Sequence, residues 1–253
     1  MTPAILNDLT LCVGCKACAL ACKEVNELPL ESGTEVLNST TWTAVQARNG
    51  LFVRRQCMHC LDPACASVCP VSALRKSAEG PVIYDEDRCI GCRYCMIGCP
   101  FNVPTYEWDS PLPRVRKCIM CFEKRLAEGQ QPACTAACPT GATKFGDRDE
   151  LIAEARARIA AHPDRYVDHI YGLEEAGGTS VLYLSSVPFE TVGLPTRVQS
   201  DPYPRLTWNV LSKLPNVVSV AGVALFGIWW ITSRRDDVAR AEQPESDEHG
   251  GRS

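Results

Sequence analysis

The longest uninterrupted apolar stretch of the chain lies near its C-terminus, from Leu214 to Thr232. It carries no charged residue, and as a helix it is apolar on every face. At about 1.5 Å per residue, such a helix is about 28 Å long, close to the hydrocarbon thickness of a bilayer. The pair Trp229-Trp230 and then Arg234-Arg235 suit a membrane interface. The pattern predicts a single transmembrane helix, and a buried helix of a soluble domain is the alternative.

Basic residues lie on both sides of this stretch, so the orientation is indicated only by which of them lie closest to its ends. Arg234 and Arg235 stand closest and follow it, which favours a C-terminus in the cytoplasm. The tail, 233–253, is polar and rich in Asp and Glu, and we expect it to be disordered. Thr2 to Asn7 shows no apolar core or twin-arginine pair of a secretory signal. If the rest of the protein lies outside the cytoplasm, a signal-bearing partner must carry it there.

Shorter apolar patterns predict both helices and strands upstream of this stretch. Apolar positions at helical spacing, with acids early and arginines late, predict a helix over 149–161. The other predicted elements are a helix over 17–25 and short strands over 41–47, 82–85 and 181–184. Four prolines between Pro188 and Pro204 predict an extended arm with little core of its own. Such an arm is expected to lie against a partner or another domain.

Cysteine is the residue type that sets the composition apart. The apolar and charged fractions are ordinary, and a net charge of −4 gives no reason to expect nucleic acid. All sixteen cysteines fall into groups of four, which are Cys12, Cys15, Cys18 and Cys22; Cys57, Cys60, Cys65 and Cys69; Cys89, Cys92, Cys95 and Cys99; and Cys118, Cys121, Cys134 and Cys138. Disulfides, four-thiolate zinc sites and iron–sulfur clusters all use such groups.

The third group has the spacing that discriminates between these chemistries. It reads C-x2-C-x2-C-x3-C-P from Cys89 to Pro100, the run of bacterial ferredoxins that bind [4Fe–4S] clusters. Zinc ribbons pair two C-x2-C units and do not need this run, and disulfide scaffolds are usually shorter chains. In the ferredoxin run, three thiolates hold one cluster and the fourth holds another. The spacing therefore predicts iron–sulfur clusters whose ligands are exchanged between groups.

The turn after the fourth cysteine repeats along the chain. Cys69-Pro70-Val71-Ser72-Ala73 and Cys138-Pro139-Thr140-Gly141-Ala142 share a proline that ends a helical turn. The repeat is about 30 residues long, with one unit per group. Group one departs from it, because Lys23 follows Cys22, so its turn must differ. Group four carries an insertion, Phe122 to Ala133, which is either a solvated loop or a partner contact.

Charged and polar residues near the ligands have two interpretations each. Lys16, Arg93 and Lys117 favour a reduced, more negative cluster if they lie near it, and otherwise they are surface charges. His59 stands between two ligands of a complete group, so we expect a structural or supporting role. Trp42 is expected to be a packing residue. The sequence has no nucleophile–base pair, phosphate loop or open metal site, so we expect no substrate chemistry.

These motifs together resemble a known family, the four-cluster ferredoxin-like electron-transfer subunits of membrane-bound oxidoreductases. The family includes the beta subunits of respiratory formate dehydrogenases and related molybdopterin enzymes, and the matching subunit of periplasmic nickel–iron hydrogenases. The resemblance covers nearly the whole chain, including an apolar C-terminal helix like that of the anchored members. It rests on Cys57-Met58-His59-Cys60, Cys69-Pro70-Val71-Ser72-Ala73-Leu74, the run from Cys89 to Pro100, Arg116-Lys117-Cys118, and Tyr171-Gly172 with Gly177-Gly178-Thr179.

The resemblance implies how ligands are shared, because the family pairs group one with group four and group two with group three. The implied ligand sets for four [4Fe–4S] clusters are Cys12, Cys15, Cys18 and Cys138; Cys118, Cys121, Cys134 and Cys22; Cys57, Cys60, Cys65 and Cys99; and Cys89, Cys92, Cys95 and Cys69. The implied fold class is α+β, with two pseudo-symmetric two-cluster ferredoxin-like modules, the extended arm and one transmembrane helix. The expected regions are the cluster region 1–148, the helix and arm 149–213, the transmembrane helix 214–232 and the tail 233–253.

The resemblance also implies a function, that of a non-catalytic relay subunit. It carries electrons between a catalytic oxidoreductase subunit and an integral membrane cytochrome b or quinone-reactive subunit. We expect a single-pass protein of the bacterial inner membrane with a periplasmic cluster region. Gly177-Gly178-Thr179 and the short group-four loop favour formate dehydrogenase over nickel–iron hydrogenase as the complex. A structural zinc-binding protein and a soluble ferredoxin-type shuttle are the alternatives from other classes.

Overall fold

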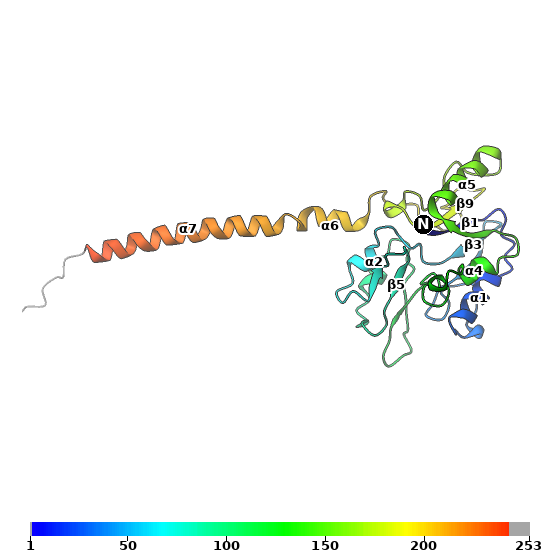
Figure 1. The fold of residues 1–253 in the computed structure, drawn as a ribbon, viewed down its shortest axis with the longest axis horizontal. Helices are drawn as coiled ribbons and strands as arrows, with labels where there is room; N and C mark the ends of the chain where they lie inside the picture. Colours follow the sequence, from blue (N-terminus) through cyan, green and yellow to red (C-terminus); the bar gives the residue numbers. More distant parts are fainter. Residues whose placement is uncertain (1, 243–253) are drawn as a thin grey trace, which may run out of the picture. The chain divides into compact units, whose positions relative to one another are not determined.

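The computed structural model describes residues 2–242 of the chain. They divide into two compact units, with the boundary after Arg205. The larger unit contains all sixteen cysteines, a three-stranded sheet and three two-stranded ribbons (Figure 1). The smaller unit is helical. A mixed helix-and-strand fold is therefore confirmed for the part of the chain that bears the cysteines.

The three-stranded sheet joins the two ends of the larger unit. Its central strand is β1 (Pro3–Asp8), which pairs antiparallel with β8 (Thr143–Asp147) and parallel with β9 (Val181–Leu184). Helix α5 (Arg148–Ala161) contacts β1 and β8, and it buries Leu151 and Ala155 beside them. The bounds of β9 are those that the sequence predicts, and α5 begins one residue earlier than predicted.

The cysteine groups lie in loops that lead into short helices and ribbons. These elements are α1 (Ala17–Val25), η1 (Leu30–Ser32), β2 (Ala44–Arg48), β3 (Leu51–Arg55), α2 (Ala64–Ser67), β4 (Leu74–Lys76), β5 (Val82–Tyr84), α3 (Tyr94–Gly98), β6 (Thr105–Tyr106), β7 (Val115–Arg116), η2 (Leu126–Glu128), α4 (Ala133–Ala136) and η3 (Glu175–Gly177). Helix α1 has the predicted bounds, and the predicted strand over 41–47 is part of the β2–β3 hairpin.

The short helices pack in pairs that are distant in sequence. Helix α1, from group one, contacts α4, from group four, and Figure 1 shows the two side by side. Helix α2, from group two, contacts α3, from group three. Between the members of the first pair, the chain passes through all of groups two and three. These contacts bring together the groups whose cysteines are expected to share clusters.

The proline-rich segment after β9 packs into the main core of the larger unit. Phe189, Val192 and Leu194 are each at most 5% exposed and lie in one cluster with Tyr171 and Tyr183. The ring centroids of Phe189 and Tyr171 are 5.1 Å apart. The segment is irregular, as the prolines predict, but its apolar side chains belong to the core of its own unit.

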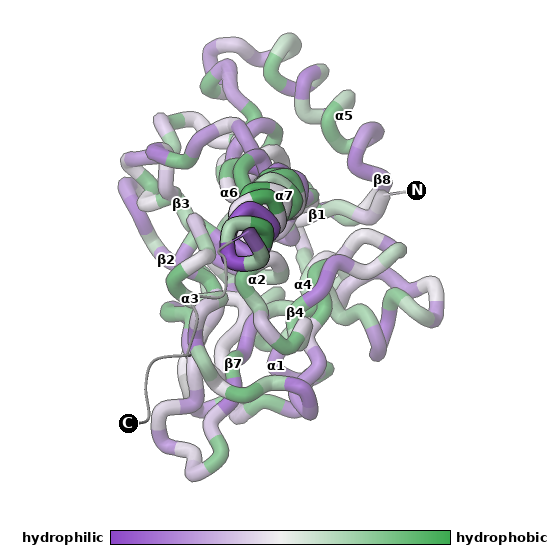
Figure 2. Tube along the Cα trace, turned by 90° about the vertical axis from the view of Figure 1, so that its left-hand side faces the viewer, coloured by the Kyte–Doolittle hydropathy of each residue, from purple (hydrophilic) through white to green (hydrophobic). Residues whose placement is uncertain are grey.

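The smaller unit carries the predicted apolar helix. Helix α6 (Tyr203–Leu211) leads to α7 (Leu214–Ala241), and the span Tyr203–Ala241 is long and apolar enough to cross a membrane. Its apolar side chains are exposed in the structure, and Figure 2 shows hydrophobic positions along α7. The helix continues to Ala241, which corrects the disorder expected from residue 233, because no proline or glycine interrupts this segment. The rest of the predicted tail, 243–253, lies outside the described residues.

Candidate iron–sulfur sites

Groups one and three fold into the same backbone turn around their first three cysteines. Gly14 and Gly91 both have a φ of 69°, and Lys16 and Arg93, two residues later, have φ values of 63° and 65°. Positive φ suits glycine, and a Cβ on Gly14 would lie 2.4 Å from the Phe52 ring. The two groups are therefore alike in backbone conformation as well as in sequence.

The turns after the fourth cysteines also correspond, with one exception. Ser72, Asn102 and Gly141 occupy the third position after the cysteine, and their φ values are 52°, 53° and 66°. The reversal returns a backbone N–H to the sulfur, as in Ala73, whose N lies 3.2 Å from Cys69 Sγ. Donors of this kind stabilise a thiolate ligand and help to set the potential of a bound cluster.

Group one is the exception that the lysine after its fourth cysteine predicts. Helix α1 continues past Cys22, so the chain does not reverse there. Lys23 is 1% exposed, and its Nζ donates to the carbonyl oxygens of Pro29 and Thr40 at 2.9 and 3.0 Å. The sulfur of Cys22 receives a side-chain donor instead of a backbone one, from Asn26 Nδ2 at 3.7 Å.

Electrostatic interactions between thiols link cysteines of different sequence groups. In the first set, Cys12 and Cys18 interact with each other and with Cys138, and Cys12 also interacts with Cys15. In the second set, Cys118 interacts with Cys22, Cys121 and Cys134. In the third set, Cys60 interacts with Cys57, Cys65 and Cys99, and in the fourth, Cys95 interacts with Cys69, Cys89 and Cys92. We refer to these sets as quartets one, two, three and four, in that order. Each joins three cysteines of one group to the fourth cysteine of another. The quartets are the ligand sets that the family resemblance implies, and thiols also interact between them.

The quartets also follow one another in a line. The thiols that interact across neighbouring quartets are Cys18 with Cys134, Cys118 with Cys57, and Cys65 with Cys95. Quartets two and three contain mostly buried cysteines, whereas Cys15 of quartet one is exposed. The arrangement gives two inner sites and two outer sites, an order that the spacing of the cysteines alone does not supply.

The four cysteines of quartet four line a small cavity. The cavity is also lined by apolar residues that include Leu74 and Val115. Burial alone would raise the pKa of the Cys89 thiol, but nearby donors, among them the backbone N–H of Gly91 at 3.5 Å, lower it below its usual value. Four thiols lining one cavity, an apolar wall and a backbone N–H donor suit a thiolate-bound cluster.

Burial controls the protonation of most of the thiols. It raises the pKa of Cys22, Cys65 and Cys95 to about 12. Cys138 has a lowered pKa, because hydrogen bonds from Thr143 and neighbouring groups outweigh its burial. A metal ligand must be the thiolate, so cluster binding has to release protons from the buried cysteines.

Besides Lys23, two further buried cations lie near the quartets, and the sequence indicates only one of them. Lys117 is 3% exposed and interacts electrostatically with Cys65, so it is not a surface charge. Arg54 is 2% exposed and interacts with thiols of quartets one and two. In contrast, Lys16 pairs with Glu35 at the surface. Arg93 is exposed, but it also lines the quartet-four cavity. The only sequence signal for Arg54 is that it stands three residues before a group.

His59 is fully buried between its two flanking ligands. Its Nδ1 accepts the backbone N–H of Val82 at 3.0 Å, so Nε2 carries the proton of the neutral ring. Burial, followed by the charge of Lys117, lowers its pKa well below the usual range. The expected structural role of His59 is consistent with this neutral, hydrogen-bonded position, and the packing role of Trp42 is consistent with its partial burial and its bond to the Ser39 carbonyl.

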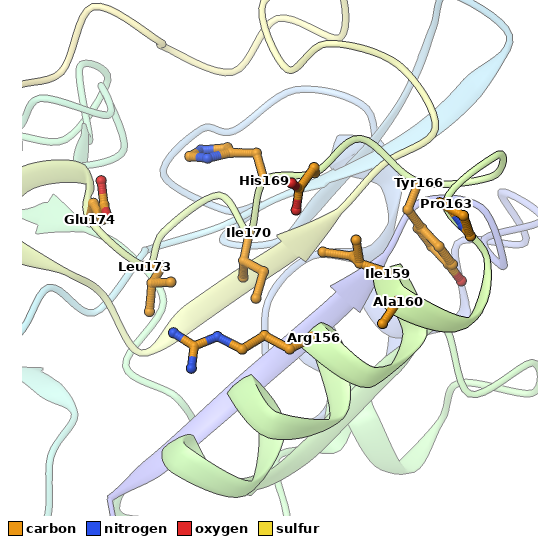
Figure 3. Close-up of a pocket in the computed structure, with 10 residues that line it drawn as sticks. Arg156, Ile159, Ala160, Pro163, Tyr166, His169, Ile170, Leu173 and Glu174 are labelled. Carbon is orange, nitrogen blue, oxygen red and sulfur yellow. The ribbon is translucent and has the colours of Figure 1, made fainter.

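A separate surface pocket lies between α5 and the segment 163–174 (Figure 3). Its walls include Arg156, Tyr166 and His169, and no cysteine lines it. The Tyr166 hydroxyl donates to Asp8 Oδ2 at 2.8 Å, so it is engaged in the core of the unit. Within residues 2–242, no three or more His, Cys, Asp or Glu side chains are close enough together to hold a single metal ion.

Several known proteins have sequences similar to this chain. A family described as a 4Fe-4S dicluster domain matches residues 48–148. The chain is 41% identical to a protein of Nitratidesulfovibrio vulgaris, over 96% of the chain and 70% of that protein. It is 40% identical to the hydrogenase-2 operon protein HybA of Escherichia coli O157:H7, over 76% of the chain and 72% of that protein. It is 39% identical to the nitrate-inducible formate dehydrogenase iron-sulfur subunit of Escherichia coli K12, over 72% and 67%.

Proposed function

We propose that this chain, which belongs to the family of iron–sulfur electron-transfer subunits of formate dehydrogenases and hydrogenase-2, relays electrons between a catalytic subunit and a quinone-linked membrane subunit. The observation that carries the proposal is the line of four cysteine quartets in a chain that also has an apolar C-terminal helix. A line of redox sites with an anchor suits transport of electrons toward a membrane.

Each quartet is proposed to hold one [4Fe–4S] cluster, which gives four clusters in two modules. The packing of α1 on α4 and of α2 on α3 supports this division, because each helix pair belongs to two quartets. When bound, a [4Fe–4S] cluster supplies reversible one-electron exchange. The protein's part is to hold the thiolates, to donate N–H groups to sulfur and to exclude water from the inner sites.

The outer quartets are the proposed places where electrons enter and leave the chain. Near quartet one, Val13 is 60% exposed, and near quartet four, Ile90 and Ile97 are 64% and 84% exposed. Exposed apolar side chains beside a redox site favour partner docking, since they gain most by burial in an interface. The inner quartets have mostly buried ligands, so the outer two are the accessible ones.

The proposed location is the bacterial inner membrane, with α7 as a single-pass anchor. The apolar side chains of α7, among them Val223, Leu225 and Trp229, are exposed over its whole length, which suits contact with lipid. Arg234 lies over the Trp230 ring, as expected for a basic and aromatic interface at the end of a span. On the proposed orientation, the cluster region is periplasmic, a signal-bearing partner carries it across, and the C-terminus is cytoplasmic.

The catalytic partner is proposed to be a formate dehydrogenase-type molybdopterin enzyme, with a membrane-bound nickel–iron hydrogenase as the second candidate. Relatives named for both kinds of complex have nearly the same identity to this chain. The proposal for formate dehydrogenase therefore rests on Gly177-Gly178-Thr179 and the short group-four loop. In the structure this glycine pair forms a turn next to group two, where Leu61 N donates to the Gly178 carbonyl oxygen at 3.0 Å.

The test is to purify the full-length protein from membranes with whatever subunits remain bound. We expect broad visible absorption and about sixteen iron and sixteen sulfide atoms per chain, as four cubane clusters require. Molybdenum or tungsten in the complex supports the formate dehydrogenase assignment, and nickel supports the hydrogenase. A colourless protein that contains zinc, or a chain that leaves the membrane without detergent, would refute the proposed function.

A further inference from the structure

Arg54 is a buried cation whose hydrogen-bond partners are neutral. It lies on β3 and is 2% exposed, and its Nη1 donates to Asn7 Oδ1 at 3.0 Å. Its Nη2 donates to Gln56 Oε1. The two amides fix the plane of the guanidinium, but neither carries a charge to balance it. A buried cation without a counter-charge is costly, so an anion is expected beside it.

The same three side chains have surplus donors that point to a missing acceptor. Arg54 Nε, Asn7 Nδ2 and Gln56 Nε2 are buried, and none has a hydrogen-bond partner among the described residues. Asn7 Oδ1 is already occupied, because it also accepts the Thr143 hydroxyl at 3.1 Å, and this fixes the orientation of the amide. Three unused N–H groups around one cation indicate a ligand with negative charge and several acceptor atoms.

The thiols around Arg54 come from two quartets. Its strongest thiol interactions are with Cys134 of quartet two and Cys18 of quartet one. It also interacts with Cys12 of quartet one and with Cys22 and Cys121 of quartet two. The guanidinium therefore lies at the junction of two neighbouring sites in the proposed line, where two thiolate-bound clusters would bring their negative charge together.

We propose that Arg54 is a counter-cation shared by the clusters of quartets one and two, and that its charge raises the reduction potential of both. This inference rests on the function proposed above, because it requires those two quartets to hold clusters. Reduction adds one negative charge to a cluster, so a nearby fixed cation stabilises the reduced form. Asn7 and Gln56 act as positioning residues, since they hold the guanidinium at the junction.

The variants Arg54→Gln and Arg54→Lys test the charge, and Arg55→Gln is the matched control. Arg55 is the next residue of β3, and its guanidinium donates to the Gly193 and Phe101 carbonyl oxygens instead. Each variant is purified as the full chain in its complex, and iron is counted. The potentials of the clusters are then measured by redox titration with electron paramagnetic resonance.

In Arg54→Gln we expect two of the four clusters to become harder to reduce. At the original midpoint, the ratio of reduced to oxidised cluster should fall at least tenfold, which is a 59 mV shift for a one-electron couple. The iron content should stay unchanged, and Arg55→Gln should leave all four potentials in place. Arg54→Lys keeps the charge, so it should retain more than half of the original effect.

Three results would overturn the inference while leaving the proposed function intact. They are unchanged potentials in Arg54→Gln with full iron content, an equal shift of all four clusters, and a shift in Arg54→Lys as large as in Arg54→Gln. If Arg54→Gln loses its clusters, the test rests on Arg54→Lys. Full clusters with retained potentials in Arg54→Lys support the proposed role of the charge, and loss of clusters in that variant overturns it. A wild-type protein without clusters would instead refute the proposed function.

Discussion

Replacing Cys99 tests the exchange of ligands between groups, because its sequence neighbours and its spatial neighbours belong to different sets. By spacing it stands with Cys95, but its thiol interacts with those of Cys57 and Cys60. Cys99→Ala should therefore remove the cluster of quartet three and leave quartet four with all its ligands. We expect the variant to lose about one quarter of its iron, as one of four cubanes.

Double variants turn this expectation into a test of additivity. Cys60→Ala/Cys99→Ala changes two ligands of one quartet, so it should lose no more iron than either single variant, about one quarter. Cys95→Ala/Cys99→Ala changes ligands of two quartets, so it should lose about one half. Iron losses from two mutations at one shared site do not add, whereas losses from mutations at independent sites do, so the two double variants should differ.

The assay is iron content per folded chain, measured together with the number of clusters that give electron paramagnetic resonance signals on reduction. Retention of a three-iron core by the single variants would make each loss smaller, but the two double variants would still differ. Equal losses in the two double variants would refute the reasoning. A loss of one half in Cys60→Ala/Cys99→Ala, with one quarter in the other, would show that group three holds its own cluster.

Three further predictions concern stability and location. A chain that stops after Lys213 lacks α7 and should move from the membrane fraction to the soluble fraction. Partner subunits alone could still hold it at the membrane, so the control is detergent-free extraction of the isolated subunit. Phe189→Ala should lower stability by about 3 kcal/mol, because it leaves a cavity beside Tyr171; unchanged thermal unfolding would mean that the segment is a free arm. Arg158→Met removes the charged partner, at 2.8 Å, of the buried Asp8 carboxylate, which keeps its hydrogen bonds from Tyr166 and Thr10. We expect the free energy of unfolding to fall by about 2–3 kcal/mol, which is less than the usual ~3–5 kcal/mol for a buried pair because Arg158 is partly exposed. The unfolding midpoint should fall by about 5–10 °C, whereas the control Arg156→Met should have little effect.

The sequence predicts best the elements whose signal is local. Helix α1 and strand β9 have the predicted bounds, because the ligand spacing specifies α1 and a short apolar run specifies β9. The apolar span inside α7 is likewise a local property. The sequence does not predict its continuation to Ala241, because polar and charged residues without proline or glycine suit a solvated helix as well as a disordered tail.

The sequence does not predict the central strand β1 or the burial of Arg54. Strand β1 is buried on both faces, so its polar Asn7 and Asp8 hide it from any alternating pattern. Arg54 sits in a hairpin strand where a basic residue suggests an exposed face. Its burial depends on the distant elements that pack around the hairpin, and no single stretch of sequence carries that information.

The three-stranded sheet has a consequence for the order in which the protein is built. A ribosome releases the chain from its N-terminus, so β1 appears first but must wait for β8 and β9, which end at Asp147 and Leu184. The cysteines of quartets three and four are all present once Cys99 has emerged. Groups two and three can thus be complete and folded before group one pairs with group four. Folding should therefore start with the inserted module, and cluster loading in the cell should follow the same sequence.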